Sequence, residues 1–141
     1  MASDILIVDD EADICELVAD ILQDEGHGTR TAHDSDEALS AVVARLPNLV
    51  FLDIRLRGSG LDGLQLLDSL RQQHPELPIV MISGHGNKET IVSVIKRGAY
   101  DYMEKPFTAA RLTVVAERAL ENSSLKCARA THSACGTGNQ P

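Results

Sequence analysis

The stretch I-L-I-V-D-D-E, residues 5–11, places three acidic residues directly after four aliphatic ones. A short apolar run of this kind is typical of a strand that is buried on both faces of a parallel sheet. Similar runs occur at residues 49–52 and 79–82, preceded by Asn48 and Pro78. We therefore expect three buried strands, and the first of them ends in a group of carboxylates.

Segments with helical periodicity separate these runs. Apolar residues recur at i, i+3, i+4, i+7 and i+8 from Ile14 to Leu22, and Gly26 stops that helix. Five successive strand-then-helix units predict a doubly wound α/β fold, with a parallel five-stranded sheet covered by helices on both faces. The other expected elements are strands at 28–32 and 99–103 and helices over 36–45, 64–73, 88–97 and 108–122.

Length and charge narrow the class of protein. The 141 residues are 43% hydrophobic, which is enough for one domain with its own core. The net charge of −8 and the pI near 5.0 argue against binding to nucleic acid or to an anionic membrane surface. No apolar run approaches the roughly 20 residues of a membrane span, and three cysteines without framework spacing indicate a reducing compartment. We expect a cytoplasmic protein.

The C-terminal residues differ in composition from the rest. Residues 123–141 show no apolar period and are rich in small polar residues, which is typical of disorder. We therefore expect one domain over residues 1–122, followed by a disordered tail that is either native or left by cloning.

Chemically active side chains follow four of the predicted strands. Asp9 and Asp10 come after the first strand and Asp53 after the third, while Ser83 and Lys105 come after the fourth and fifth. In doubly wound sheets, ligands bind outside the carboxyl ends of the strands. We therefore expect these five side chains to meet at one edge of the sheet.

Three of these side chains are acidic, and they would repel each other if their strands are neighbours. Two unit charges about 4 Å apart repel by roughly 4 kcal/mol at an effective dielectric near 20, so the group needs a cation or a proton. Oxygen ligands suit Mg²⁺, or Mn²⁺, better than zinc. An isolated Asp9-Asp10 pair would be interpreted more simply as a cap and a favourable charge at the start of a helix. Because Asp53, Ser83 and Lys105 follow other strands of the same sheet, we favour a metal site.

A phosphoryl-accepting site fits this set of residues. A carboxylate beside Mg²⁺ can attack a phosphorus atom and form an acyl phosphate. In this interpretation Asp53 is the nucleophile, Lys105 neutralises charge on the phosphoryl oxygens, and Ser83 donates a hydrogen bond to one of them.

Four short motifs resemble those of a known family. They are V-D-D-E at 8–11, L-D-I at 52–54, I-S-G at 82–84 and E-K-P-F at 104–107. In this order and spacing they are similar to the receiver domain of two-component response regulators, over residues 4 to about 122. The resemblance implies a flavodoxin-like (βα)5 fold with strand order 2-1-3-4-5.

The resemblance also implies roles for single residues. Asp53 would accept phosphate from a histidine kinase, and Mg²⁺ would be held by Asp9, Asp10, Asp53 and the backbone carbonyl of Arg55. Ser83 and Tyr102 would form a switch pair, although Tyr102 fits a static, half-buried strand position equally well. The protein would thus act as a phosphorelay switch rather than as an enzyme, and the surface over residues 88–122 is the expected homodimer or partner face.

Two further segments are most similar to nitrogen-regulation activators of the NtrX and NtrC type. They are S-G-H-G-N at 83–87 and G-A-Y-D-Y at 98–102. Such regulators continue into an ATPase module and a DNA-binding module, which the 141 residues do not include. The resemblance therefore implies an output in sigma-54-type transcription regulation.

One loop departs from the usual pattern of the family. Arg57 stands where the family usually has proline, four residues after the phosphoacceptor, and Asp62-Gly63 arrives about two residues late. The longer loop over 54–62 leaves open the lifetime of the phosphorylated state. It also keeps an alternative function open, a degenerate receiver that binds proteins without being phosphorylated.

Two enzyme classes fit less well. A haloacid-dehalogenase-type phosphatase needs a second aspartate two residues after the nucleophile, where this chain has Arg55. The segment G-S-G-L-D-G at 58–63 fits a dinucleotide-binding pattern, but the acidic ribose partner expected about 20 residues later is missing. Glu11, the third acid of the opening stretch, is interpreted as a favourable charge in the first turn of a helix.

Overall fold

The computed structural model describes residues 3–56, 60–84 and 88–133, with side chains up to Glu121. Among these residues, five parallel strands form one sheet in the order β2-β1-β3-β4-β5. The strands are β1 (Asp4–Val8), β2 (Gly28–Ala32), β3 (Leu49–Asp53), β4 (Ile79–Ser83) and β5 (Asp101–Glu104). Both the doubly wound α/β class and the strand order implied by the resemblance are confirmed.

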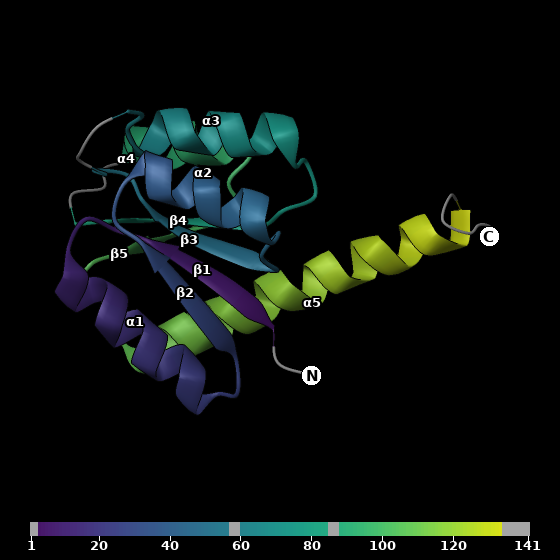
Figure 1. Cartoon of the computed structure of the whole chain (residues 1–141), viewed down its shortest axis with the longest axis horizontal. Helices are drawn as coiled ribbons and strands as arrows, with labels where there is room; N and C mark the ends of the chain where they lie inside the picture. The colour runs from purple at the N-terminus through teal and green to yellow at the C-terminus, as the bar shows by residue number, and fades with distance from the viewer. Residues whose placement is uncertain (1–2, 57–59, 85–87, 134–141) are drawn as a thin grey trace.

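Helices cover both faces of this sheet (Figure 1). One layer consists of α1 (Ala12–Asp24) and α5 (Ala109–Ser133). The other consists of α2 (Ser35–Ala44), α3 (Gly63–Gln73) and α4 (Lys88–Lys96). Because every strand runs in the same direction, the carboxyl ends of all five strands lie at one edge of the sheet.

Alternate residues of the central strands serve two separate cores. Ile5 and Ile7 of β1 pack with residues of α1 and α5, whereas Leu6 and Val8 pack with residues of α2, α3 and α4. All four side chains are at most 1% exposed. Successive side chains of a strand point to opposite faces, so a strand covered on both faces must be apolar throughout. This explains the continuous apolar runs of the sequence.

Two element boundaries differ by more than one residue from those expected. Strand β5 begins at Asp101 rather than 99, because the N–H of Ala99 donates to the carbonyl of Val94 and still closes α4. Helix α5 continues to Ser133, so residues 123–133, which we expected in a disordered tail, are helical (Figure 1). Residues 134–141 lie outside the described part of the chain.

An ion-pair network closes the amino-terminal edge of the sheet. Asp4 accepts hydrogen bonds from Arg30 Nε at 3.1 Å and Nη2 at 2.7 Å, and from Arg45 Nε at 3.1 Å. Arg30 Nη1 also donates to the carbonyl of Ala41, which ties β1 and β2 to the end of α2.

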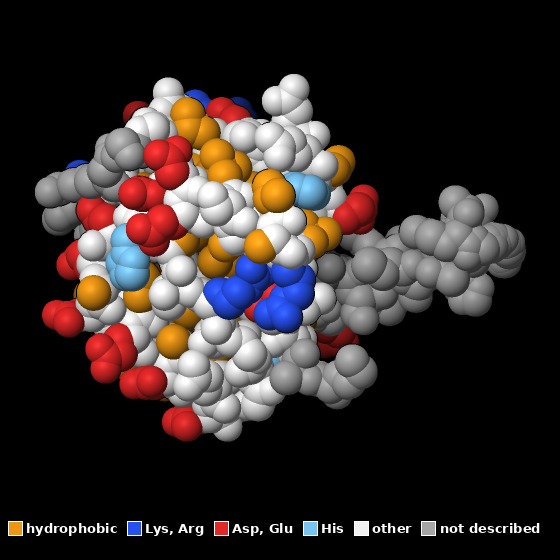
Figure 2. Space-filling view, in the orientation of Figure 1, with side chains coloured by type: hydrophobic (Ala, Val, Ile, Leu, Met, Phe, Trp, Pro, Cys, Tyr) orange, Lys and Arg blue, Asp and Glu red, His pale blue; other side chains and the backbone are white. Residues whose placement is uncertain are grey.

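The face of the molecule that Figure 2 shows carries many acidic side chains, in keeping with the net charge of −8.

Within the described residues, none of the helices combines the length and the apolar character that crossing a lipid bilayer would require.

Candidate functional site

Four carboxylates converge at the carboxyl ends of β1 and β3. Asp9, Asp10 and Glu11 follow β1, and Asp53 is the last residue of β3. Val8 is paired with Leu52 in the sheet, which brings the residues that follow them side by side. One oxygen from each of the four carboxylates lies within 4.8 Å of the other three. The structure therefore brings Asp53 beside Asp9 and Asp10, from which it is widely separated in the sequence.

Lys105 reaches this cluster from the other side of the site. It follows β5, and its Nζ lies 3.1 Å from Asp9 Oδ2, 3.2 Å from Glu11 Oε1 and 3.6 Å from Asp53 Oδ2. Its backbone N–H donates to the carbonyl of Ser83, which fixes it beside the end of β4, and the peptide bond to Pro106 is cis. Among the residues that the structure describes, Lys105 is the cation that contacts the cluster.

The electrostatics of the cluster are unfavourable for Asp9. Burial raises the pKa of its carboxyl, and the charge of Asp53 raises it further. The backbone N–H of Glu11 and the ammonium of Lys105 lower it only in part. Although Asp9 and Lys105 form an ion pair, the effects of burial and of the charge on Asp53 are larger, and the pKa of Asp9 is raised overall.

The ammonium group experiences the opposite balance. Burial lowers the pKa of Lys105, but the surrounding carboxylates outweigh this and raise it overall. Lys105 is therefore charged at neutral pH, and its three N–H donors face three acceptors.

Backbone groups hold the two buried aspartates in place. The N–H of Glu11 donates to Asp9 Oδ1 at 2.9 Å, and the N–H of Arg55 donates to Asp53 Oδ1 at 3.1 Å. Behind Asp9, the thiol of Cys15 donates to its backbone carbonyl at 3.3 Å. Burial, then the charge of Asp9, raises the pKa of this thiol to about 11, so it is neutral at pH 7. These donors fix the direction of the carboxylates.

Ser83 and Tyr102 lie on the neighbouring strands β4 and β5, and Ser83 is the last residue of β4, which pairs with β3. Both side chains are buried, and Tyr102 packs with Val94 of α4 in one core. Burial raises the pKa of Tyr102, an effect that the Ser83 hydroxyl partly offsets. Tyr102 Oη nevertheless has no hydrogen bond of good geometry within the described part of the chain. A buried hydroxyl in this condition is free to take a new partner.

Glu11 is part of the acidic cluster. Its interpretation from the sequence, as a favourable charge at the start of a helix, did not predict this. It is the residue before α1, yet its side chain makes no capping hydrogen bond. Its carboxylate instead accepts from Lys105, 94 positions along the chain. The local sequence carries no signal for this contact, because it depends on how β1 and β5 are placed in the sheet.

The donor set fits a hard divalent cation. The cluster offers carboxylate oxygens at one open edge, and Asp10 and Glu11 remain accessible to solvent while Asp9 and Asp53 are buried. Oxygen-only ligands with room for water or a phosphoryl oxygen are typical of Mg²⁺ sites. We expect Arg55 to add a backbone carbonyl, and its N–H bond to Asp53 keeps its backbone beside the cluster.

Replacing Asp9 with asparagine should stabilise the metal-free protein. Because folding raises the pKa of Asp9, this group contributes stability at low pH and loses it as the pH rises through the folded pKa. At pH 7 we expect Asp9→Asn to raise the free energy of unfolding by on the order of 1 kcal/mol. The gain should shrink toward pH 3.8, where the wild-type carboxyl is protonated.

Urea denaturation in EDTA at both pH values measures this difference. Asp13→Asn, which removes an exposed acid from the first turn of α1, serves as the matched control and should change stability little. A wild-type protein more stable than Asp9→Asn at pH 7 would contradict the electrostatic argument.

Comparison with known proteins agrees with this geometry. The family model for the response regulator receiver domain matches residues 5–117. The chain is 65% identical over 126 residues to the nitrogen assimilation regulatory protein NtrX of Azorhizobium caulinodans. That match covers 89% of this chain but 28% of the relative, so the chain spans little more than a quarter of its length.

Two solved structures extend the comparison. The receiver domain of NtrX from Brucella abortus is 70% identical, with a TM-score of 0.81 over 84% of this chain and 98% of that one. The beryllofluoride-activated NtrC4 receiver domain dimer is 32% identical, with a TM-score of 0.79 over 85% and 98%. The chain therefore belongs to the family of response regulator receiver domains.

Proposed function

We propose that the chain is a phosphorylation-controlled switch in which Asp53 accepts a phosphoryl group from a histidine kinase. The observation that supports this most directly is the meeting of Asp9, Asp10 and Asp53 with Lys105 at one open edge of the sheet. The output it controls would be transcription regulation of the sigma-54 type, through an output module that is not part of these 141 residues.

The chemical step is a transfer between phosphohistidine and aspartate. A carboxylate oxygen of Asp53 attacks the phosphorus, the P–N bond breaks, and the imidazole nitrogen keeps the electron pair and takes up a proton. Asp53 Oδ1 is engaged by the N–H of Arg55, whereas Oδ2 faces Lys105 at 3.6 Å. Lys105 would then donate to a phosphoryl oxygen and offset the new negative charge.

The metal would be Mg²⁺ or Mn²⁺, held by Asp9, Asp10, Asp53 and the carbonyl of Arg55. Bound there, it would neutralise charge on the phosphoryl oxygens and on the cluster itself. The chain's own contribution is to keep the buried carboxylates oriented through the donors from Glu11 and Arg55.

Ser83 and Tyr102 would carry the signal away from Asp53. Phosphorylation adds roughly 1.5 to 2 negative charges and new acceptor oxygens, which would draw the Ser83 hydroxyl toward the phosphoryl group. Tyr102 Oη, unpartnered among the described residues, could then move toward Ser83. Tyr102 packs with Val94, the fully buried residue of α4, so this movement would reach α4 directly.

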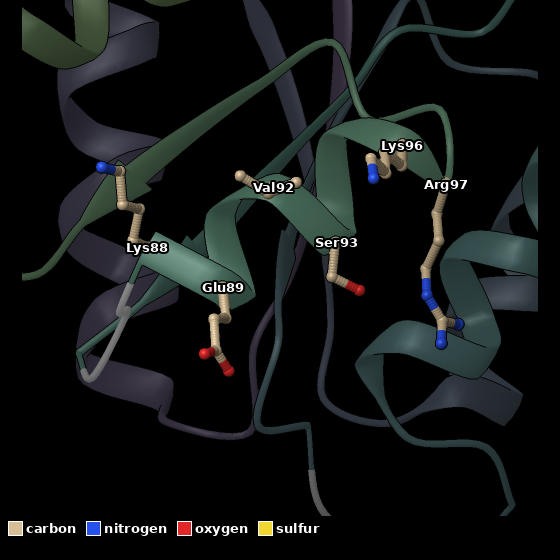
Figure 3. Close-up of a pocket in the computed structure, with 6 residues that line it drawn as sticks. All are labelled: Lys88, Glu89, Val92, Ser93, Lys96 and Arg97. Carbon is tan, nitrogen blue, oxygen red and sulfur yellow. The ribbon is translucent and has the colours of Figure 1, made fainter.

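The surface of α4, β5 and α5 is the proposed output face. A shallow depression of about 700 Å³ runs along α4 (Figure 3). It is lined by Lys88, Glu89, Val92, Ser93, Lys96 and Arg97. Exposed apolar side chains of α4 are Val92 and Ile95. An apolar patch within a basic rim suits association with another protein or a second receiver.

Labelling with acetyl phosphate tests the phosphoacceptor. With Mg²⁺ present, we expect one phosphoryl group per wild-type chain by intact-mass measurement, and none on Asp53→Asn, because the amide is not a nucleophile. Asp13→Asn, an exposed acid on α1, should label like wild type. A wild-type chain that takes no phosphate would favour the degenerate protein-binding receiver, and repeated turnover without a persistent adduct would favour a phosphatase.

Hydrogen exchange tests the proposed path to α4. Beryllofluoride with Mg²⁺ should change the exchange rates of amides in residues 88–104, and Ser83→Ala should remove the change because the hydroxyl that responds is missing. Ser69→Ala removes a half-buried hydroxyl of α3 instead and should leave the response intact. Identical protection of these residues with and without the mimic would rule out the path.

Sedimentation tests the homodimer over residues 88–122. With Mg²⁺ and beryllofluoride we expect the wild-type chain to associate and Ile95→Asp to remain monomeric, because Ile95 is 44% exposed on α4. Val43→Asp places the same charge at an exposed apolar position of α2, outside the face, and should associate like wild type. Equal masses for all three proteins, with and without the mimic, would contradict a dimer through this face.

A further inference from the structure

We propose that Ser35, at the start of α2, is a positioning residue for the cation site, because it anchors the long loop that leaves the phosphoacceptor strand. This inference rests on the proposed function and names a residue outside the acidic cluster. It concerns the loop between β3 and α3, whose returning limb is described from Gly60 onward.

A buried hydrogen bond joins the loop to α2. The N–H of Leu61 donates to Ser35 Oγ at 2.8 Å, across 26 positions of sequence. Ser35 is 1% exposed. The start of α2 does not need this hydroxyl, because Asp34 caps the helix by accepting from the N–H of Glu37. The hydrogen bond from Leu61 is therefore separate from the cap of α2.

Gly60 fits the loop against the same turn of α2. Its φ of +93° lies in the left-handed region, which favours glycine. A Cβ at this position would stand 2.5 Å from Ser35 Oγ and 3.3 Å from Asp36 Oδ1. The backbone thus lies directly on the α2 side chains, and Gly60 and Ser35 together fix where the loop returns.

The anchored limb continues into a close contact with the phosphoacceptor strand. Asp62 and Gln65 form a reciprocal capping box that starts α3. Between them, Gly63 has no room for a Cβ, which would collide with the carbonyl oxygens of Asp53 and Ile54. The position of the returning limb is therefore transmitted to the backbone around Asp53.

The outgoing limb is fixed by a different contact. Leu56 is buried in the core between the sheet and α2–α4, at 4% exposure. The backbone of Arg55, which carries the proposed carbonyl ligand, lies between this anchor and Asp53. Ser35 holds the far end of the same loop. Without it, the backbone of residues 60–62 would be less restrained, and so would Asp53 and Ile54, which Gly63 contacts. Ordering the Arg55 carbonyl on a cation would then lose more entropy.

Ser35→Ala should therefore weaken cation binding without changing the chemistry. A hydrogen bond of this kind contributes enough to change the half-saturating Mg²⁺ concentration by roughly threefold to tenfold. We expect this increase in acetyl phosphate labelling measured against Mg²⁺, with the rate at saturating Mg²⁺ unchanged. Ser40→Ala makes the same substitution at an exposed position of α2 and should leave the curve in place.

Three further results decide the inference. Calorimetric titration with Mg²⁺ alone should show the same loss of affinity, so the inference is tested even if the wild-type chain fails to label and the proposed phosphoacceptor function is wrong. Gly60→Ala, which displaces the loop from the α2 side, should shift Mg²⁺ affinity in the same direction. A Ser35→Ala curve that superimposes on wild type, or one with a lower maximum and no shift, would overturn the positioning role.

Discussion

Repulsion between Asp9 and Asp53 is the constraint around which this structure is organised. The parallel pairing of β1 with β3 places both carboxylates at adjacent strand ends, where they are 1% and 3% exposed. Burial raises the pKa of Asp9, and the nearby charge of Asp53 adds to this. Lys105 compensates only in part. A fold selected for stability alone would not retain such a cluster, so its persistence is best explained by a ligand that needs it.

Neighbouring groups hold the two carboxylates in a fixed orientation in spite of their repulsion. Asp9 and Asp53 cannot turn away from each other, because each accepts a hydrogen bond from a backbone N–H two residues later. The ammonium of Lys105 lies at the rim of the cluster, with carboxylate acceptors on three sides. An incoming cation or phosphoryl group therefore meets carboxylates that are already oriented, and little reorganisation is required on binding.

Much of this arrangement could be predicted from the sequence, and the failures have identifiable causes. Strands that are buried on both faces appear in the sequence as continuous apolar runs. In a parallel sheet the residues that follow these strands must lie at the same edge. That β1 neighbours β3 was implied by family resemblance, because no local pattern encodes strand order. Glu11 and Ser35 were missed since their partners, Lys105 and Leu61, are distant in sequence. Residues 123–133 lack an apolar stripe, which argues against burial but not against a helix, and their Leu, Lys, Ala and Arg residues favour one.

A switch also needs an element that yields, and α4 is the one whose packing is weakest. Val94 is its one fully buried residue, whereas α1, α2 and α3 each bury at least three. Arg97, just beyond α4, forms an ion pair with Asp68 of α3, and both side chains are more than a third exposed. Such exposed pairs contribute at most about 1 kcal/mol. Rearranging α4 would therefore break fewer buried contacts than rearranging α1, α2 or α3, which makes α4 the element that a change at the acidic cluster would move most readily.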